Sequence, residues 1–220
     1  MKVTRCIALL LVVVSSSATA QQAPPKPPDH MQHRFDDPAR LAKSFDDPKR
    51  DAWQMPDRVI AALRLDPAHA VADVGAGTGY FSMRLAKAVP NGVVYAVDIE
   101  PNMVAHLKTR AAGEKLTNVT PVLGSATSPN VPKPVDLILV VDTYHHIGNR
   151  PEYFRALQSQ LLPAGRIAII DFRKDAPEGP PAHFRFTPEQ IQKEMAEAGY
   201  ALTGQHDFLP RQHFLVFGRR

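Results

Sequence analysis

The sequence predicts an α/β fold, a doubly wound and mostly parallel sheet of seven strands that ends in an antiparallel hairpin. Three observations lead to this prediction. Short apolar runs alternate with amphipathic segments of 9–12 residues from position 57 onward. A glycine-rich turn at 75–79 separates the first apolar run from the amphipathic segment that follows it. The last two apolar runs are joined by only a few residues, which suits a hairpin rather than a crossover.

Each element is predicted from its own local pattern. Helices are expected where apolar residues recur at helical spacing, and strands where apolar and β-branched residues form short runs. The expected helices cover 57–65, 80–89, 103–113, 151–161 and 188–198. The expected strands cover 70–74, 93–97, 119–123, 135–141, 166–172, 202–208 and 213–217. Because right-handed crossovers place the first five strands parallel, ligands are expected at their carboxyl ends.

The first 20 residues have the pattern of a secretory signal peptide. Lys2 and Arg5 precede an apolar run from Cys6 to Val14, and small residues follow at 18–20. The apolar run has 9 residues, whereas a membrane-spanning helix needs roughly 20. We therefore expect no stable membrane insertion, cleavage after Ala20, and an exported protein that is periplasmic or secreted. An uncleaved anchor and a misassigned start remain alternatives.

The charge and the cysteine content change when these residues are removed. The whole chain of 220 residues has a formal net charge of +4 and one cysteine. Without residues 1–20 it has 24 basic and 22 acidic residues and no cysteine. A mature chain of this kind has neither disulfides nor a cysteine nucleophile. Its near-neutral charge gives no basis for a nucleic-acid partner.

Two segments lie between the predicted signal peptide and the first core helix. Residues 21–34 include four prolines between positions 21 and 29, and we interpret them as a flexible leader. Residues 35–56 contain Phe-Asp-Asp-Pro twice, ten residues apart. Asp before Pro is a helix start, because Asp caps free N–H groups and Pro suits the first turn. We interpret residues 35–56 as a helical lid in which Phe45 and Trp53 exclude water; simple packing of a terminal helix on the sheet is the alternative.

The turn Gly75-Ala76-Gly77-Thr78-Gly79 is the most informative stretch. Glycines there let the backbone turn tightly and approach a ligand. Asp98 ends the second strand, 23 residues past Gly75, where a carboxylate can accept hydrogen bonds from both ribose hydroxyls of a nucleoside. The dinucleotide pattern Gly-x-Gly-x-x-Gly is not met, because Tyr80 takes the place of its third glycine, and no Lys-Ser/Thr follows as in a phosphate loop. An adenosine ligand without phosphates is the remaining alternative.

The glycine turn resembles motif I of the class I S-adenosylmethionine-dependent methyltransferases, and the order of elements in residues 57–220 is similar to that of their seven-stranded domain. Asp98 matches their ribose-binding acid, and residues 99–103 resemble the loop beside the adenine. Residues 136–142 resemble the fourth strand of these enzymes, and residues 162–166 resemble the turn before the fifth strand. The chain is most similar to small-molecule methyltransferases of the type 11 and type 25 groups, which include exported bacterial members.

The resemblance implies S-adenosyl-L-methionine as the cofactor. The cofactor-binding residues that it implies are Asp73, Gly75, Gly77, Gly79, Tyr80, Asp98, Ile99, Met103, Ser125 and Asp142. Ser125 stands where many relatives have an Asp that binds the adenine amine. Since Ser125 carries no charge, adenine recognition is expected to depend more on packing against Met103 and on backbone groups.

The candidate catalytic residues follow the fourth strand. Methyl transfer from a sulfonium requires an aligned acceptor and, for a neutral nucleophile, a group that removes a proton. His145 or His146 could be this general base, and Tyr144 could act beside them or form a wall of the acceptor pocket. A solvent-facing His and a packed His are the alternative. The loop 175–186, with Arg173, His183 and Arg185 in and beside it, is another expected wall.

Other chemistries are less compatible with the sequence. His30 and His33 lie beside the leader and no His-x-x-x-His spacing occurs, so we expect no metal site. The fourth strand is not followed by the two prolines typical of DNA-base methylation, and arsenite methylation needs paired cysteines. The expected acceptor is a small, partly apolar molecule, with a protein side chain as the less favoured alternative. A non-catalytic, exported nucleoside- or metabolite-binding protein with the same fold is the alternative, because S-adenosylmethionine is made in the cytoplasm.

Overall fold

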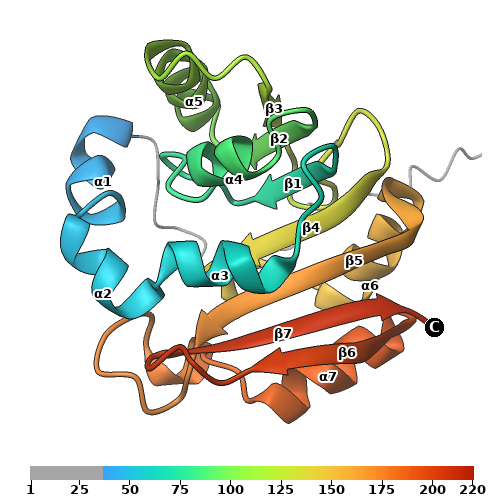
Figure 1. Cartoon of the computed structure of the whole chain (residues 1–220). Coiled ribbons are helices and arrows are strands. Elements are labelled where there is room, and N and C mark those ends of the chain that lie inside the picture. The colour runs from blue at the N-terminus through green and yellow to red at the C-terminus, as the bar shows by residue number, and fades with distance from the viewer. Residues whose placement is uncertain (1–36) are drawn as a thin grey trace, which may run out of the picture. The chain divides into compact units, whose positions relative to one another are not determined.

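A seven-stranded sheet forms the centre of the computed structural model, which describes residues 37–220 (Figure 1). Its order is β3-β2-β1-β4-β5-β7-β6. The strands are β1 (Ala70–Val74), β2 (Val93–Asp98), β3 (Val119–Leu123), β4 (Val135–Val141), β5 (Leu161–Phe172), β6 (Tyr200–His206) and β7 (Gln212–Arg219). Neighbours among β1–β5 pair parallel, and β7 is antiparallel to both β5 and β6. The predicted fold class is thus confirmed.

Helices cover both faces of the sheet (Figure 1). The α-helices are α1 (Pro38–Phe45), α2 (Asp51–Gln54), α3 (Pro56–Leu63), α4 (Ser82–Ala88), α5 (Pro101–Gly113), α6 (Arg150–Ala156) and α7 (Pro188–Glu197). The 3₁₀ turns are η2 (Pro48–Arg50), η3 (Tyr144–His146), η4 (Leu157–Gln160) and η5 (Ala182–Phe184). Along β4, Leu137 and Leu139 pack with α3 and α4, while Ile138 and Val140 pack with α6 and α7. A strand buried on both faces reads as a continuous apolar run, which is why β4 was predictable.

The region around the start of β5 differs from the prediction. The expected helix at 151–161 ends as α6 at Ala156 and continues as η4. The fifth strand begins at Leu161, which pairs with Val135, and the next pair is Leu137 with Arg166. Residues 162–165 therefore bulge out of the sheet between these two pairs. The predicted turn at 162–165 is accommodated as this bulge.

The N-terminal segment, which we define as residues 37–56, starts its helices as the repeated Asp-Pro predicts. The side chain of Asp37 accepts a hydrogen bond from the Arg40 N–H at 3.0 Å, and that of Asp47 accepts one from the Lys49 N–H at 2.9 Å. A proline follows each Asp as the first helical residue. In Figure 1 the arrowheads of β1, β4 and β5 point toward α1 and α2. The segment thus lies at the carboxyl edge of the sheet.

The predicted signal peptide and the predicted leader lie outside the described residues, as do the first two residues of the predicted lid. Among residues 37–220, no helix has both the length and the apolar character that crossing a membrane requires.

Candidate active site

The glycine turn connects β1 with α4 and is packed tightly on two sides. The φ angles of Gly75, Gly77 and Gly79 are +77°, +54° and +94°. A Cβ atom on Gly75 would lie 2.1 Å from the hydroxyl oxygen of Thr143, and one on Gly77 would lie 3.2 Å from the Phe45 ring. The turn is therefore held between the loop after β4 and the N-terminal segment. Only residues without a Cβ suit this conformation and this spacing.

Asp98 lies at the end of β2, next to the glycine turn. Its carboxylate accepts hydrogen bonds from the N–H groups of Gly77 at 2.8 Å and Glu100 at 3.0 Å. Burial raises the pKa of Asp98, although these backbone N–H groups oppose the effect. The structure thus brings together the two features on which the nucleoside prediction rested. The carboxylate keeps free lone pairs, with which it can accept hydrogen bonds from ribose hydroxyls.

Two large apolar side chains are exposed beside Asp98. Ile99 is 55% exposed and Leu123 is 49% exposed, although most apolar residues of the sheet are buried. Asp98 and Leu123 are register partners on β2 and β3, so Ile99 and Leu123 are neighbours, and Met103 is fully buried nearby on α5. This apolar rim suits a flat heterocycle. Sequence analysis did not select Leu123, although its position at the end of a strand was the available signal.

Ser125 has its hydroxyl engaged within its own loop. The oxygen accepts a hydrogen bond from the Ser128 N–H at 3.0 Å and lies 3.1 Å from the Ser128 carbonyl. The Ser125 N–H donates to the same carbonyl at 2.7 Å. The adenine contact implied for Ser125 stays a prediction.

Two carboxylates flank the glycine turn, the buried one of Asp73 and the partly buried one of Asp142, whose side chain is 20% exposed. Asp73, on β1, accepts a hydrogen bond from the Ser82 hydroxyl at 2.6 Å. Asp142, directly after β4, accepts hydrogen bonds from Arg50 at 3.1 Å and Gln54 at 3.3 Å. Burial is the main cause that raises the pKa of each carboxyl to about 6. Asp142 also accepts a hydrogen bond from the Gln212 side-chain amide of β7.

Among residues 37–220, two buried side-chain polar atoms have no hydrogen-bond partner, the hydroxyl oxygen of Thr78 and Oε1 of Gln212. Buried polar atoms are almost always paired. Thr78 belongs to the glycine turn, and the other end of the Gln212 amide donates to Asp142. Both orphaned atoms are therefore next to groups predicted to bind the cofactor, and the residues present fit a polar ligand at this place.

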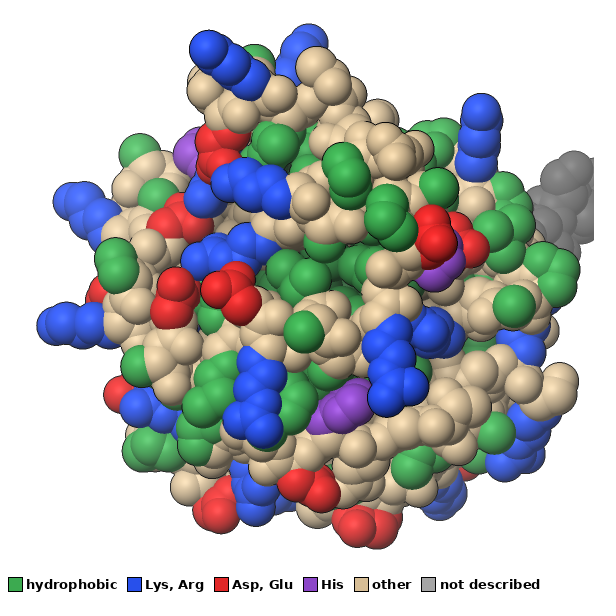
Figure 2. All heavy atoms as spheres, viewed as in Figure 1, with side chains coloured by type: hydrophobic (Ala, Val, Ile, Leu, Met, Phe, Trp, Pro, Cys, Tyr) green, Lys and Arg blue, Asp and Glu red, His purple; other side chains and the backbone are tan. Residues whose placement is uncertain are grey.

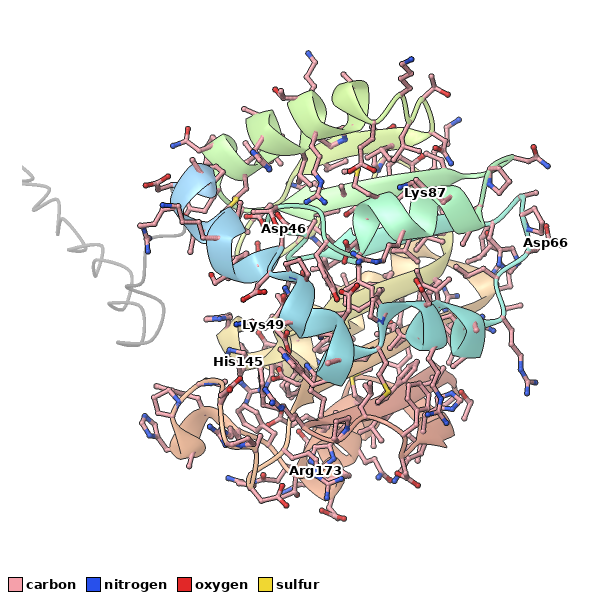
Figure 3. All side chains as sticks on the ribbon, turned by 60° about the vertical axis from the view of Figure 1, so that its left-hand side comes forward. Asp46, Lys49, Asp66, Lys87, His145 and Arg173 are labelled. Carbon is pink, nitrogen blue, oxygen red and sulfur yellow. The ribbon has the colours of Figure 1, made fainter. Side chains whose placement is uncertain are left out.

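His145 forms a buried pair with Asp171. It lies on η3, is 5% exposed, and its Nδ1 is 2.9 Å from both carboxylate oxygens of Asp171. The Asp171 carboxylate also accepts the His145 backbone N–H at 3.1 Å. Burial lowers the pKa of His145, but its hydrogen bond to Asp171 and the charges of Asp171 and Asp142 outweigh that effect, so the pKa is raised. In the view of Figure 3, His145 lies between Lys49 of the N-terminal segment and Arg173 after β5.

When Asp171 accepts a hydrogen bond from the Nδ1–H group of His145, Nε2 is left as the basic atom of the ring. Sequence analysis did not select Asp171. The available signal was an acid next to the last residue of the fifth strand, close to the position that Asp98 has at the end of the second.

The neighbours of His145 have different surroundings. The ring of His146 is 4.2 Å from that of His145, and His146 is partly exposed. Tyr144 is fully buried, stacks on Phe154 of α6, and donates its hydroxyl to Glu194 of α7. Burial and this carboxylate raise the pKa of Tyr144 above its usual range. The structure therefore brings the two histidines together and places Tyr144 in the core between the sheet and α6–α7.

The N-terminal segment is joined to the glycine turn and to α4 and α5 by charges. Asp51 accepts a hydrogen bond from the Tyr80 hydroxyl and pairs with Arg84 at 3.2 Å, and Asp46 pairs with Arg110 of α5 at 2.7 Å. Figure 2 shows the interspersed acidic and basic side chains on this side of the molecule. The segment thus docks over the glycine turn through charges and hydrogen bonds, in addition to the Phe45 contact. Its role as a lid stays a prediction.

The second predicted lid hydrophobe contacts the end of β5. The Trp53 ring lies 5.7 Å from the ring of Phe172, which directly follows Asp171. The guanidinium of Arg211, in the loop before β7, lies over Trp53 at 5.2 Å. Arg173 directly follows Phe172 in the chain, and 39% of its side chain is exposed. Arg211 and Arg173 are paired with Glu178 at 2.6 Å and Asp175 at 3.3 Å, so an apolar surface with paired charges at its rim lies at the carboxyl edge beside the His145–Asp171 pair.

The predicted wall at 175–186 is organised by Arg185. This side chain is 9% exposed and donates to the carbonyls of Ala176 at 2.6 Å, Pro180 at 2.7 Å and Lys174 at 3.2 Å. Its fourth carbonyl contact, with Arg173, is 3.4 Å long. The buried guanidinium of Arg185 thus holds the loop together by binding several of its backbone carbonyls.

Within the described part of the chain, no group of three or more His, Asp or Glu side chains is arranged to hold a metal ion. His30 and His33 lie outside this part.

Comparison with known proteins decides the family. A family model described as "Methyltransferase domain" matches residues 65–210. The chain belongs to the class I S-adenosylmethionine-dependent methyltransferases. The crystal structure of a SAM-dependent methyltransferase from Aquifex aeolicus superposes on this methyltransferase with a TM-score of 0.76 at 26% identity, covering 82% of this chain and 97% of that one.

Curated relatives match a smaller part of the methyltransferase. Phosphoethanolamine N-methyltransferase 1 of Arabidopsis thaliana is 30% identical over 125 residues, which are 57% of this chain and 25% of that protein. Malonyl-[acyl-carrier protein] O-methyltransferase 1 of Ilyobacter polytropus is 29% identical over 135 residues, which are 61% of this chain and 50% of that protein. The chain spans a quarter to a half of the length of these relatives. Their family and the fold support S-adenosylmethionine as the cofactor of this enzyme.

Proposed function

We propose that the methyltransferase transfers a methyl group to a small molecule with His145 as the general base. The observation that carries the proposal is the His145–Asp171 pair at 2.9 Å, at the carboxyl edge of β4 and β5. The glycine turn after β1 is at the same edge, because β1, β4 and β5 are parallel. A proton acceptor and the cofactor cradle thus share one edge of the sheet, where ligands of such folds bind.

Named groups supply the parts of the cofactor site. When bound, S-adenosylmethionine supplies a methyl group on a sulfonium sulfur and leaves as the neutral thioether. Asp98 would bind the ribose hydroxyls, while Ile99, Leu123 and Met103 would pack against the adenine. The glycine turn permits close approach of the ligand to the backbone. Asp73 and Asp142 would face its positive charges.

His145 has the geometry of a general base. Asp171 holds the imidazole by its Nδ1 and would stabilise the imidazolium that forms. Nε2 of His145 would take the proton that a neutral hydroxyl or amine loses as it gains the methyl group. Because the pKa of His145 is raised, this base is available only above that raised pKa, and activity should increase as the pH rises through it.

The acceptor is proposed to be a small, partly apolar molecule with an acidic substituent. The rings of Trp53 and Phe172, which are tilted by 39°, offer an apolar surface. Arg211 and Arg173 lie at its rim, where they are paired with the exposed carboxylates of Glu178 and Asp175. Cationic groups of this kind favour carboxylates or phosphates. Two relatives are named for the acceptors phosphoethanolamine and malonyl-[acyl-carrier protein], which motivates including phosphorylated amines and carboxylic acids among the acceptors tested.

The test combines methyl transfer with calorimetry on the full-length chain. A panel of small carboxylic acids, phenols, amines and phosphorylated amines is incubated with cofactor that is radiolabelled in its methyl group. We expect His145→Gln to lower kcat by about 100-fold or more and to leave the Kd for S-adenosylhomocysteine unchanged. His106→Gln, on the surface of α5, is the control and should leave both quantities unchanged. Tight cofactor binding without a methylated product from any acceptor class would favour the non-catalytic binding protein instead.

We also propose that the enzyme is exported, with Gln21 as its first mature residue. The support is the sequence pattern of residues 1–20. Cell fractionation followed by N-terminal sequencing tests it, and Leu10→Arg, which places a charge in the apolar run, is the control. We expect Gln21 at the N-terminus of the exported protein and retention of the Leu10→Arg variant. An unprocessed protein in the cytoplasmic fraction would contradict the proposal.

A further inference from the structure

We infer that Arg185 binds the acidic substituent of the methyl acceptor, a carboxylate or a phosphate monoester, through Nη2 of its guanidinium. The inference rests on the proposed function, because it concerns the molecule that receives the methyl group. Arg185 is then a residue that determines acceptor specificity, in addition to holding the loop 173–187 together.

Arg185 is a buried cation without an acidic partner. Among residues 37–220 it is the only buried arginine, and no carboxylate of that part of the chain forms an ion pair with it. Arginine is rarely buried unless it is paired, because removing a charge from water is costly. The carbonyls around Arg185 carry dipoles but no net negative charge. An anion beside this guanidinium would therefore be stabilised.

One nitrogen of the Arg185 guanidinium is left for a ligand. Nε donates to the Pro180 carbonyl at 2.7 Å, and Nη1 donates to the carbonyls of Ala176 at 2.6 Å and Lys174 at 3.2 Å. Nη2 has two N–H groups, and neither has a hydrogen-bond partner in the described part of the chain. Nη2 is not one of the buried polar atoms that lack a partner there, so solvent reaches it. Because carbonyls hold the other two nitrogens, the direction of Nη2 is set before a ligand binds.

The middle of the loop packs on the apolar surface of the proposed acceptor site. The loop begins directly after Phe172, and in Figure 1 it extends past the arrowhead of β5. A Cβ atom on Gly179 would lie 2.6 Å from the Phe172 ring, so the loop backbone lies against this ring. The next residue, Pro180, has its carbonyl bound by Arg185. The guanidinium is thus held next to the part of the loop that contacts the apolar surface.

The end of the loop contacts the turn that carries the proposed base. Phe186 directly follows Arg185, and its ring makes an edge contact with Tyr144 at a centroid distance of 5.4 Å. Tyr144 precedes His145 on η3. Along the loop, Arg185 therefore lies between a contact with the apolar surface and a contact with η3. An acceptor that lies on the apolar surface and faces His145 has this loop as its wall.

The other two cations at this edge already have acidic partners. Arg211 is paired with Glu178 at 2.6 Å, and Arg173 is paired with Asp175 at 3.3 Å. An acceptor carboxylate at either of them competes with the acid already there. At Arg185 the same carboxylate is the first acidic partner, so binding adds a charge-assisted hydrogen bond without breaking an ion pair.

Titration with matched small probes isolates this contact. Benzoate and phenyl phosphate carry the two candidate anions on an apolar ring, and benzamide has the shape of benzoate without its charge. Trp53 is the only tryptophan of the chain, so its fluorescence reports on binding at the apolar surface. The full-length chain is saturated with S-adenosylhomocysteine, which keeps the probes out of the cofactor site, and the ionic strength is held constant.

In the wild type, we expect the better of the two anions to bind at least about 10-fold more tightly than benzamide. Whichever anion binds more tightly identifies the acidic substituent as a carboxylate or a phosphate. Arg185→Gln should reduce the preference for the anion to less than about twofold. The matched control is Arg173→Gln, in the same loop, because Arg173 already has Asp175 as its partner. It should leave the preference unchanged.

The outcomes separate a ligand contact from a structural one. Equal weakening of the anion and of benzamide by Arg185→Gln would show that the guanidinium only supports the loop, and it would overturn the inference. A wild type that binds neither anion more tightly than benzamide would overturn it too, as would a preference that is lost in Arg173→Gln and kept in Arg185→Gln. Should Arg185→Gln not fold, Arg185→Lys retains the charge without the planar fork and is expected to reduce the preference by about 3-fold.

Failure of this inference differs from failure of the proposed function. An anion preference that depends on Arg185, together with no methylated product from any acceptor class, would contradict only the proposed function. Methyl transfer without any anion preference would contradict only the role of Arg185. A wild type that does not bind S-adenosylhomocysteine would contradict both.

Discussion

Gly75→Ala tests how tightly the glycine turn is packed against the loop after β4. Two costs can be taken from the structure. The residue has φ = +77°, and an L-residue in this region costs about 1–2 kcal/mol. The new Cβ would lie 2.1, 2.5 and 2.8 Å from Oγ1, Cγ2 and Cβ of Thr143, and overpacking of this kind costs about 1–3 kcal/mol. We therefore expect the free energy of unfolding to fall by about 2–5 kcal/mol, a large part of the roughly 5–15 kcal/mol of a typical domain.

Urea unfolding followed by circular dichroism measures this change. Gly113→Ala is the control, because nothing lies within 4 Å of its Cβ position at the end of α5. It should be neutral or stabilising by up to about 1 kcal/mol. The double variant Gly75→Ala/Thr143→Gly removes the three clashing atoms, so it should be more stable than the sum of the two single changes predicts. A Gly75→Ala protein within about 0.5 kcal/mol of the wild type, or additive changes in the double variant, would refute the reasoning.

Three further predictions concern buried polar groups. The raised pKa of Asp73 contributes stability that is present below pH 3.8 and lost as the pH rises through about 6. Between pH 4 and 7, the free energy of unfolding of Asp73→Asn, measured in urea, should therefore rise by about 3 kcal/mol relative to that of the wild type. A difference between the two proteins that does not change with pH would contradict this. Tyr144→Phe should lower the free energy of unfolding by about 1–2 kcal/mol through the lost bond to Glu194, while the Kd for S-adenosylhomocysteine and methyl transfer stay unchanged. Loss of transfer in the folded variant would instead support the catalytic role predicted for Tyr144. Arg185→Ala leaves the loop carbonyls without their shared donor, so limited proteolysis should cut residues 173–187 faster than in the wild type, and an unchanged cleavage rate would show that the loop holds its shape without the guanidinium.

Sequence reasoning succeeded where the signal is local. The order of strands and helices followed from hydrophobic periodicity, and the helix starts at Asp37 and Asp47 followed from short-range capping. Gly75 and Asp98 were recognisable because the first directly follows a strand and the second ends one, and because parallel strands bring their carboxyl ends to one edge.

The orientation of neighbouring side chains was beyond that reasoning. Tyr144 and His145 are adjacent in the chain, yet one is buried toward α6 and α7 and the other is paired with Asp171. Both lie on the short turn η3, where neither the period of a helix nor that of a strand applies. Their surroundings depend on which elements pack on each side of β4.

The sequence by itself determined the fold class, the cofactor family and the place of the glycine turn, since all three depend on patterns of neighbouring residues. Only the tertiary structure decided which distant side chains complete the site. Arg50 reaches Asp142 across 92 positions, and Gln212 reaches it across 70. Such contacts leave no periodic trace in a single chain, because they arise when the N-terminal segment and β7 meet at the carboxyl edge of the folded sheet.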